Sequence, residues 1–111
     1  MLERRKHRRV PTDLNFSFFI DGQEHIGKVG NVSLSGAFLS DPEPEFIPSL
    51  ISHLGDLKIQ LNDELLLLKS EVVYAVGHDN AFFPVGAGVV FSKTDEMTQL
   101  CIMKLAAILK L

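Results

Sequence analysis

Hydrophobic and polar residues alternate along much of the chain, a pattern that predicts short strands with one buried and one solvated face. The clearest example is residues 56–61, Asp-Leu-Lys-Ile-Gln-Leu, in which every second side chain is apolar. Aromatic and apolar residues fill 14–20, and Asp21-Gly22 follows as a strong signal for a two-residue hairpin turn. We therefore expect residues 14–20 and 23–29 to form the first hairpin.

The same pattern predicts further strands later in the chain, at 37–39, 56–61, 64–76 and 87–91. Within 64–76, residues 65–68 are continuously apolar, which favours burial on both faces or a position under a helix. Residues 41–48 contain three prolines and three acids. Such a segment holds neither a helix nor a central strand, and it predicts a surface excursion with solvated acids.

A helix is predicted over residues 95–109, where apolar residues recur at spacings of three and four. Thr94 is the expected N-cap, and Asp95 and Glu96 suit the positive end of the helix dipole. The apolar residues assigned to the core side of this helix are Met97, Leu100, Cys101, Leu105, Ile108 and Leu109. The whole pattern predicts an all-β dominated fold, a small six-stranded antiparallel β-barrel whose C-terminal helix packs over an open end or seam.

Composition narrows the class of protein. A chain of 111 residues that is 46% hydrophobic has room for one domain with its own core. The single cysteine excludes an internal disulfide framework, which favours a cytoplasmic location. No signal peptide and no run of about 18 apolar residues is found, so we expect no membrane span. The four histidines are dispersed, so no metal site is expected. The sequence contains neither a nucleophile motif nor a P-loop, so we do not expect an enzyme.

The positive charge is concentrated at the amino terminus. Every arginine lies between positions 4 and 9, and residues 1–10 carry a net charge of +4, from five basic residues and one acid. The rest of the chain has six lysines and 13 acids, a net charge of −7. Arginine pairs bidentately with phosphate and stacks on flat faces, so this arrangement predicts an arm that binds an anion.

Two short motifs carry a family resemblance. Arg5 and Arg9 are separated by three residues, and Asn31, Ser33 and Gly36 form an Asn-x-Ser-x-x-Gly sequence. In this order, the two motifs resemble the RxxxR and [D/N]xSxxG motifs of the PilZ family, which together bind cyclic di-GMP. Residues 86–91, Gly-Ala-Gly-Val-Val-Phe, are similar to a late strand of the same family, and the resemblance covers nearly the whole chain.

The resemblance implies a ligand, cyclic di-GMP, and no cofactor. The residues that it assigns to the ligand are Arg4, Arg5, Arg9, Asn31, Ser33 and Gly36, with Arg8, Ser35 and Gly88 in supporting positions. Arginine suits phosphate or the O6/N7 edge of guanine, Asn31 both donates and accepts, and a glycine permits close approach of the backbone. Arg4 and Arg8 form a second RxxxR pair, so the register stays open, although Val10 after Arg9 favours Arg5 and Arg9.

An arginine directly before RxxxR is associated in the family with two stacked ligand molecules, and Arg4 occupies that position. We expect residues 1–12 to form a mobile basic arm and residues 13–111 to form the barrel. The arm would fold across the ligand and signal to a downstream protein, in a pathway such as motility or biofilm control.

Two alternatives belong to other functional classes. One is a protein-interaction adaptor that keeps the PilZ fold and does not bind nucleotide appreciably. The other is nonspecific RNA or DNA binding through the arm. The acidic body and the absence of a predicted aromatic stacking surface with interleaved basic residues argue against the second, so no specific nucleic acid is expected as a partner.

Overall fold

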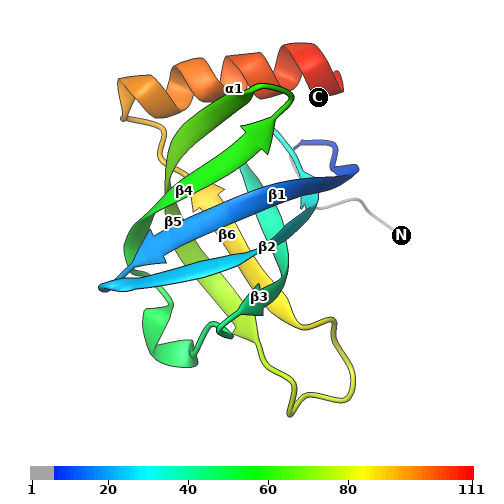
Figure 1. Ribbon diagram of the computed structural model, residues 1–111, viewed down its shortest axis with the longest axis vertical. Coiled ribbons are helices and arrows are strands. Elements are labelled where there is room, and N and C mark those ends of the chain that lie inside the picture. The colour runs from blue at the N-terminus through cyan, green and yellow to red at the C-terminus, as the bar shows by residue number, and fades with distance from the viewer. Residues whose placement is uncertain (1–6) are drawn as a thin grey trace.

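Six strands close into an antiparallel barrel in the computed structural model, which describes residues 7–111, and a helix lies across one end (Figure 1). The elements are β1 Val10–Ile20, β2 Gln23–Val32, β3 Gly36–Glu43, the 3-10 helix η1 Pro48–Leu50, β4 Leu54–Leu61, β5 Glu64–Val76, β6 Gly86–Phe91 and α1 Glu96–Leu109. The strand order around the barrel is β1-β2-β3-β6-β5-β4. The predicted six-stranded barrel with a C-terminal helix is therefore confirmed.

The hairpin between β1 and β2 turns at the predicted residues. Asp21 and Gly22 have φ angles of 50° and 79°, and two left-handed residues make the turn whose twist matches the flanking strands. β1 begins at Val10, four residues before the predicted start, because Val10 and Pro11 pair with the end of β2. Antiparallel pairing thus brings the segment that follows the arginines alongside the loop after β2.

The apolar run in β5 was expected to be buried on both faces or to lie under a helix. It is not buried on both faces. Leu66 and Leu68 are buried, whereas Leu65 and Leu67 are 51% and 44% exposed. A barrel strand has an inward and an outward face, so a run of four apolar residues places two of them outside. The expectation of burial on both faces was wrong, because the barrel wall is a single layer whose outer face meets solvent.

The proline-rich segment is more than a surface excursion. β3 continues to Glu43, and Pro42, Phe46 and Leu50 are buried. The Phe46 ring lies 5.5 Å from the Phe18 ring, measured between centroids, and so joins the core. Prolines limit the backbone but do not prevent neighbouring apolar side chains from closing an end of the barrel.

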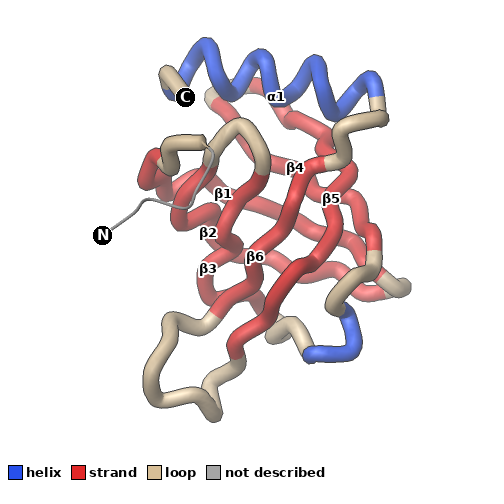
Figure 2. The backbone as a smooth tube through the Cα atoms, turned by 180° about the vertical axis from the view of Figure 1, so that it is seen from behind, coloured by secondary structure: helices blue, strands red, loops and turns tan. Residues whose placement is uncertain are grey.

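Helix α1 lies across the other end of the barrel, as the view from behind also shows (Figure 2). Its N-cap is Asp95 rather than the predicted Thr94. Its buried residues are Thr98, Cys101 and Leu105, whereas Met97, Leu100 and Ile108, which were predicted to face the core, are more than half exposed. The Thr98 hydroxyl accepts a hydrogen bond from the Lys69 backbone at 2.8 Å, so a satisfied polar residue takes a core position that apolar periodicity could not identify.

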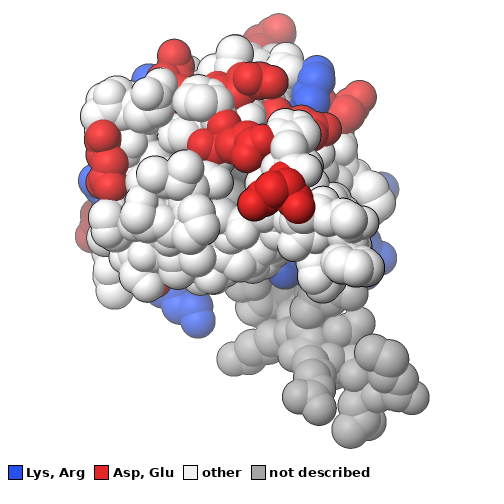
Figure 3. All heavy atoms as spheres, turned by 90° about the horizontal axis from the view of Figure 1, so that it is seen from below, with Lys and Arg blue, Asp and Glu red and all other residues white. Residues whose placement is uncertain are grey.

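The charge of the barrel is predominantly acidic away from the arm. Figure 3 looks onto the end opposite α1 and shows acidic side chains gathered on part of this face, with basic side chains mainly at its edges. Within residues 7–111, no helix is long and apolar enough to cross a membrane.

Candidate functional site

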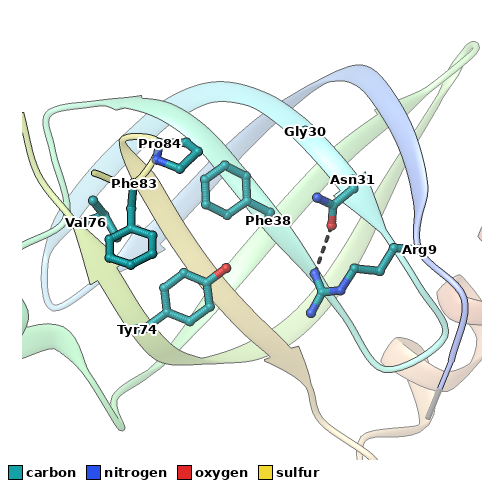
Figure 4. A pocket seen from close by; sticks show the side chains of 8 residues that line it. All are labelled: Arg9, Gly30, Asn31, Phe38, Tyr74, Val76, Phe83 and Pro84. Carbon is teal, nitrogen blue, oxygen red and sulfur yellow. Dashed lines mark hydrogen bonds between the residues drawn. The ribbon is translucent and has the colours of Figure 1, made fainter. Parts of the chain in front are cut away.

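A cleft of about 760 Å³ opens on the outer wall of the barrel (Figure 4). Its walls come from β2, β3 and β5, from the residue before β1 and from the loop before β6. The residues that line it are Arg9, Gly30, Asn31, Phe38, Tyr74, Val76, Phe83 and Pro84. The cleft therefore has a polar end, formed by Arg9 and Asn31, and a larger apolar wall.

At the polar end, the last arginine of the first motif contacts the first residue of the second. Arg9 Nη1 donates a hydrogen bond to Asn31 Oδ1 at 2.9 Å (Figure 4). The strand register explains this contact, because Pro11 pairs with Asn31 and Val10 pairs with Val32. Arg9 Nε is buried and has no hydrogen-bond partner among the described residues, so the guanidinium retains donor capacity at the cleft.

Ser33 and Ser35 do not line the cleft. The Ser33 hydroxyl accepts hydrogen bonds from the backbone N–H groups of Ser35 and Gly36 at 3.2 and 3.3 Å. The Ser33 N–H donates to the Gly36 carbonyl at 2.8 Å, and the Ser33 and Ser35 hydroxyls lie 3.1 Å apart. The buried Ser33 side chain therefore holds the loop between β2 and β3 in shape.

The two glycines of the predicted site, Gly36 and Gly88, do not line the cleft, and each allows close packing instead. A Cβ on Gly36 would stand 2.1 Å from the Val89 carbonyl oxygen, so β3 can approach β6 only with glycine here. Gly36 does not have a positive φ, so this close approach is what requires a glycine here. A Cβ on Gly88 would stand 2.1 Å from Tyr74 Cε2, so Gly88 lies beneath the Tyr74 ring.

The adjacent arginines Arg8 and Arg9 make contacts with different parts of the molecule. Arg8 Nη2 donates to the carbonyl of Lys110 at 2.9 Å, just after the end of α1. Arg9 lies in the cleft. The predicted ligand residues Arg4 and Arg5 lie outside the described residues. The structure thus brings Arg9 and Asn31 together and leaves Arg8, Ser33, Ser35, Gly36 and Gly88 outside the cleft lining.

The apolar wall was missed by sequence reasoning. Phe38 of β3 and Tyr74 of β5 have ring centroids 6.4 Å apart and an interplanar angle of 24°, and Phe83 comes from the loop before β6. The sequence predicted no aromatic stacking surface with interleaved basic residues; the cleft does have such aromatic rings, and Arg9 is the basic residue in its lining. The available signal was the pair of glycines at 86 and 88, because two glycines on one strand face leave room for aromatic rings from the neighbouring strands.

Hydrogen bonds from Thr98 lower the pKa of Asp95, and the hydrogen bond to Glu64 raises the pKa of Lys104, both on the side of α1. Within residues 7–111, no group of three or more His, Cys, Asp or Glu side chains converges as a metal site would require. What the cleft offers a ligand is a cation, an amide and aromatic faces.

The comparisons with known proteins agree with this architecture. A family model described as PilZ domain matches residues 3–108. The fold is similar to the crystal structure of the PilZ domain of CeSA from a cellulose-synthesizing bacterium, with a TM-score of 0.73 and 14% sequence identity over 94% of this chain and 99% of that one. It is also similar to the Bacillus subtilis inhibitor of motility MotI/DgrA, with a TM-score of 0.66 and 15% identity over 96% of this chain and 51% of that one. No curated protein matches the chain significantly.

Proposed function

Because the chain belongs to the PilZ domain family, we propose that it is a receptor that binds cyclic di-GMP at the Arg9–Asn31 end of the cleft. PilZ domains are cyclic di-GMP receptors, and they are regulatory binding domains rather than enzymes. The proposed role is therefore to bind the messenger and to report it, in the cytoplasm, without converting it.

The contact between Arg9 and Asn31 is the observation that carries this proposal. The 2.9 Å hydrogen bond joins the two motifs that are 22 residues apart in the sequence. A cyclic dinucleotide presents phosphate anions and guanine edges, and a guanidinium beside an amide provides donors for the phosphate and both donors and acceptors for a base edge. Arg9 Nε, buried without a partner among the described residues, is a donor that such a ligand would satisfy.

The different directions of Arg8 and Arg9 support the Arg5/Arg9 register of the first motif. Arg9 lines the cleft, whereas Arg8 binds the carbonyl after α1. In this proposal Arg5 joins Arg9 on the ligand, and Arg4 supports a second, stacked ligand molecule. Ser33 and Gly36 act indirectly, by fixing the loop that positions Asn31.

We also propose that the amino-terminal arm becomes ordered when the ligand binds. Ordering about eight backbone residues costs roughly 8 to 16 kcal/mol, whereas one charge-assisted hydrogen bond contributes about 1.5 to 3 kcal/mol. Several ligand contacts are therefore needed to hold the arm. The Arg8 contact with the Lys110 carbonyl gives a reordered arm a route to α1, and the changed surface would be read by a downstream protein.

One observation favours the adaptor as a second candidate. The apolar side chains of Met97, Leu100 and Met103 on α1 are 55%, 55% and 66% exposed. Exposed apolar groups on one element are typical of surfaces that bind other proteins. An adaptor would use this surface whether or not nucleotide is present.

Titration of the protein with cyclic di-GMP, GTP and a short oligonucleotide at two salt concentrations tests the proposal. Binding of cyclic di-GMP, but not of GTP or the oligonucleotide, supports the receptor. Absence of any nucleotide binding supports the adaptor. Oligonucleotide binding that weakens steeply with salt supports nonspecific nucleic-acid binding. NMR order parameters for residues 1–9, which precede β1, test the arm: they should be low without ligand and should rise when ligand is added.

A further inference from the structure

We propose that the aromatic rings of Phe38 and Tyr74 form a stacking platform for a purine base of the ligand. This inference rests on the proposed function, since a phosphate of the same nucleotide would be held at Arg9. It assigns ligand contacts to two residues that belong to neither sequence motif. It also makes the apolar wall of the cleft part of the binding site.

The strand register places both rings beside the same glycine. Gly88 of β6 pairs with Phe38 on one side and with Tyr74 on the other. A Cβ on Gly88 would stand 2.1 Å from Tyr74 Cε2, and a Cβ on Gly86 would stand 2.4 Å from Phe38 Cζ. The two rings therefore occupy the space that side chains on β6 would take, and they cover its backbone from outside the barrel.

The rings are exposed on the side away from that backbone. Gly86 and Gly88 are buried, whereas Tyr74 is 42% exposed and Phe38 is partly exposed. Phe83, which is 65% exposed, extends the same apolar wall from the loop before β6 (Figure 4). Continuous aromatic surface that does not serve the core is typical of a binding site.

The chemistry along the cleft favours a nucleotide base over an apolar peptide. The aromatic wall leads to a guanidinium and an amide, which bind an anion and a polar edge rather than an apolar side chain (Figure 4). A purine nucleotide combines a flat face with an attached phosphate, and bases stack on aromatic side chains. The cleft volume of about 760 Å³ lies within the range of small-molecule sites.

The composition of the chain provides a direct signal for this contact. Tyr74 is the only tyrosine and there is no tryptophan, so intrinsic tyrosine emission reports on Tyr74 alone. Titration of the full chain with cyclic di-GMP should quench this emission with the same midpoint as binding measured by calorimetry. A parallel titration of free N-acetyl-tyrosinamide corrects for light absorbed by guanine.

Three variants complete the test. Tyr74→Ala should weaken cyclic di-GMP binding by about 5-fold to 150-fold, the fold-change that corresponds to loss of one base–aromatic stack. Tyr74→Phe keeps the ring and should bind within about 2-fold of the unaltered protein. Phe82→Ala removes a ring that is 89% exposed and does not line the cleft, and it should leave binding unchanged.

The outcomes separate this inference from the proposed function. One outcome overturns the stacking platform and leaves the receptor standing. In it, the unaltered protein binds cyclic di-GMP and Arg9→Ala weakens this binding, but Tyr74→Ala does not, and tyrosine emission does not change on titration. If the unaltered protein does not bind cyclic di-GMP, the receptor is overturned and the platform is overturned with it. If an apolar peptide partner is lost in Tyr74→Ala while nucleotide binding is not, the wall is a protein interface and the stacking platform is overturned.

Discussion

The Tyr74 ring takes the space that a side chain at Gly88 would need, since a Cβ there would lie 2.1 Å from Tyr74 Cε2. The two residues pair across β5 and β6. Gly88 does not line the cleft, whereas Tyr74 does. The absence of a side chain at Gly88 therefore positions the Tyr74 ring. We expect Gly88 to affect ligand binding only through the position of this ring.

Gly88→Ala should weaken cyclic di-GMP binding because the added methyl group displaces the Tyr74 ring. In a double-mutant cycle, Gly88→Ala combined with Tyr74→Ala should bind no more weakly than Tyr74→Ala alone. Calorimetry on the four proteins measures this coupling. Fully additive losses would show that Gly88 acts independently of the ring and would contradict this account.

Gly36→Ala is expected to destabilise the barrel itself. The added Cβ would meet the Val89 carbonyl at 2.1 Å, and both partners are strand backbone that cannot move aside cheaply. We expect a loss of about 1 to 3 kcal/mol in the free energy of unfolding, measured with urea. Gly77→Ala is the control, because its nearest neighbour is the end of the flexible Glu45 side chain, and stability should change by less than about 0.5 kcal/mol.

The buried face of α1 can be tested with two leucines five residues apart. Leu105 is fully buried and Leu100 is 55% exposed, although both were predicted to face the core. Leu105→Ala should lower the free energy of unfolding by about 2 to 5 kcal/mol. Leu100→Ala should change it by less than about 0.5 kcal/mol. Equal losses in the two variants would mean that the helix is rotated from the orientation described.

The N-cap of α1 predicts a dependence of stability on pH. Hydrogen bonds from the Thr98 hydroxyl, at 2.6 Å, and from the Thr98 N–H, at 3.0 Å, lower the pKa of Asp95 below its ordinary value of 3.8. Because the folded-state pKa lies below the unfolded-state pKa, this stabilisation is complete above the unfolded value. It is lost as the pH falls through the folded value.

Asp95→Asn should therefore reduce the loss of thermal stability between neutral pH and about pH 3, because residue 95 no longer titrates. Melting temperatures measured by circular dichroism across this range test the prediction. The matched control is Asp13→Asn, which changes an exposed carboxylate on β1. An identical pH profile for Asp95→Asn and the unaltered protein would count against the cap.

Most of the fold could be predicted from local sequence, because strand alternation and the Asp21-Gly22 turn are local signals. What the sequence did not reveal depends on closure of the barrel. The outward position of Leu65 and Leu67, the buried Phe46 and the core position of Thr98 each follow from packing between distant elements. Periodicity along one segment contains no information about which neighbour covers it.

The site was predictable in part for the same reason. The Arg9–Asn31 contact could be predicted, because antiparallel pairing of β1 with β2 places the end of the first motif beside the start of the second. The aromatic wall could not, because Phe38 and Tyr74 are 36 positions apart and meet only through the pairing of β3, β6 and β5. The glycines of β6 indicated space for rings, but not which rings would fill it.

A calorimetric titration of cyclic di-GMP into the full chain and into the Arg9→Ala and Arg8→Ala variants tests the central claim most directly. The neighbouring arginines carry the same charge, but only Arg9 lines the cleft. We expect Arg9→Ala to weaken binding by about 10-fold or more, since charge-assisted hydrogen bonds contribute about 1.5 to 3 kcal/mol each, and Arg8→Ala to retain most of the affinity. Equal affinity of Arg9→Ala and the unaltered protein, or a greater loss in Arg8→Ala, would contradict the account.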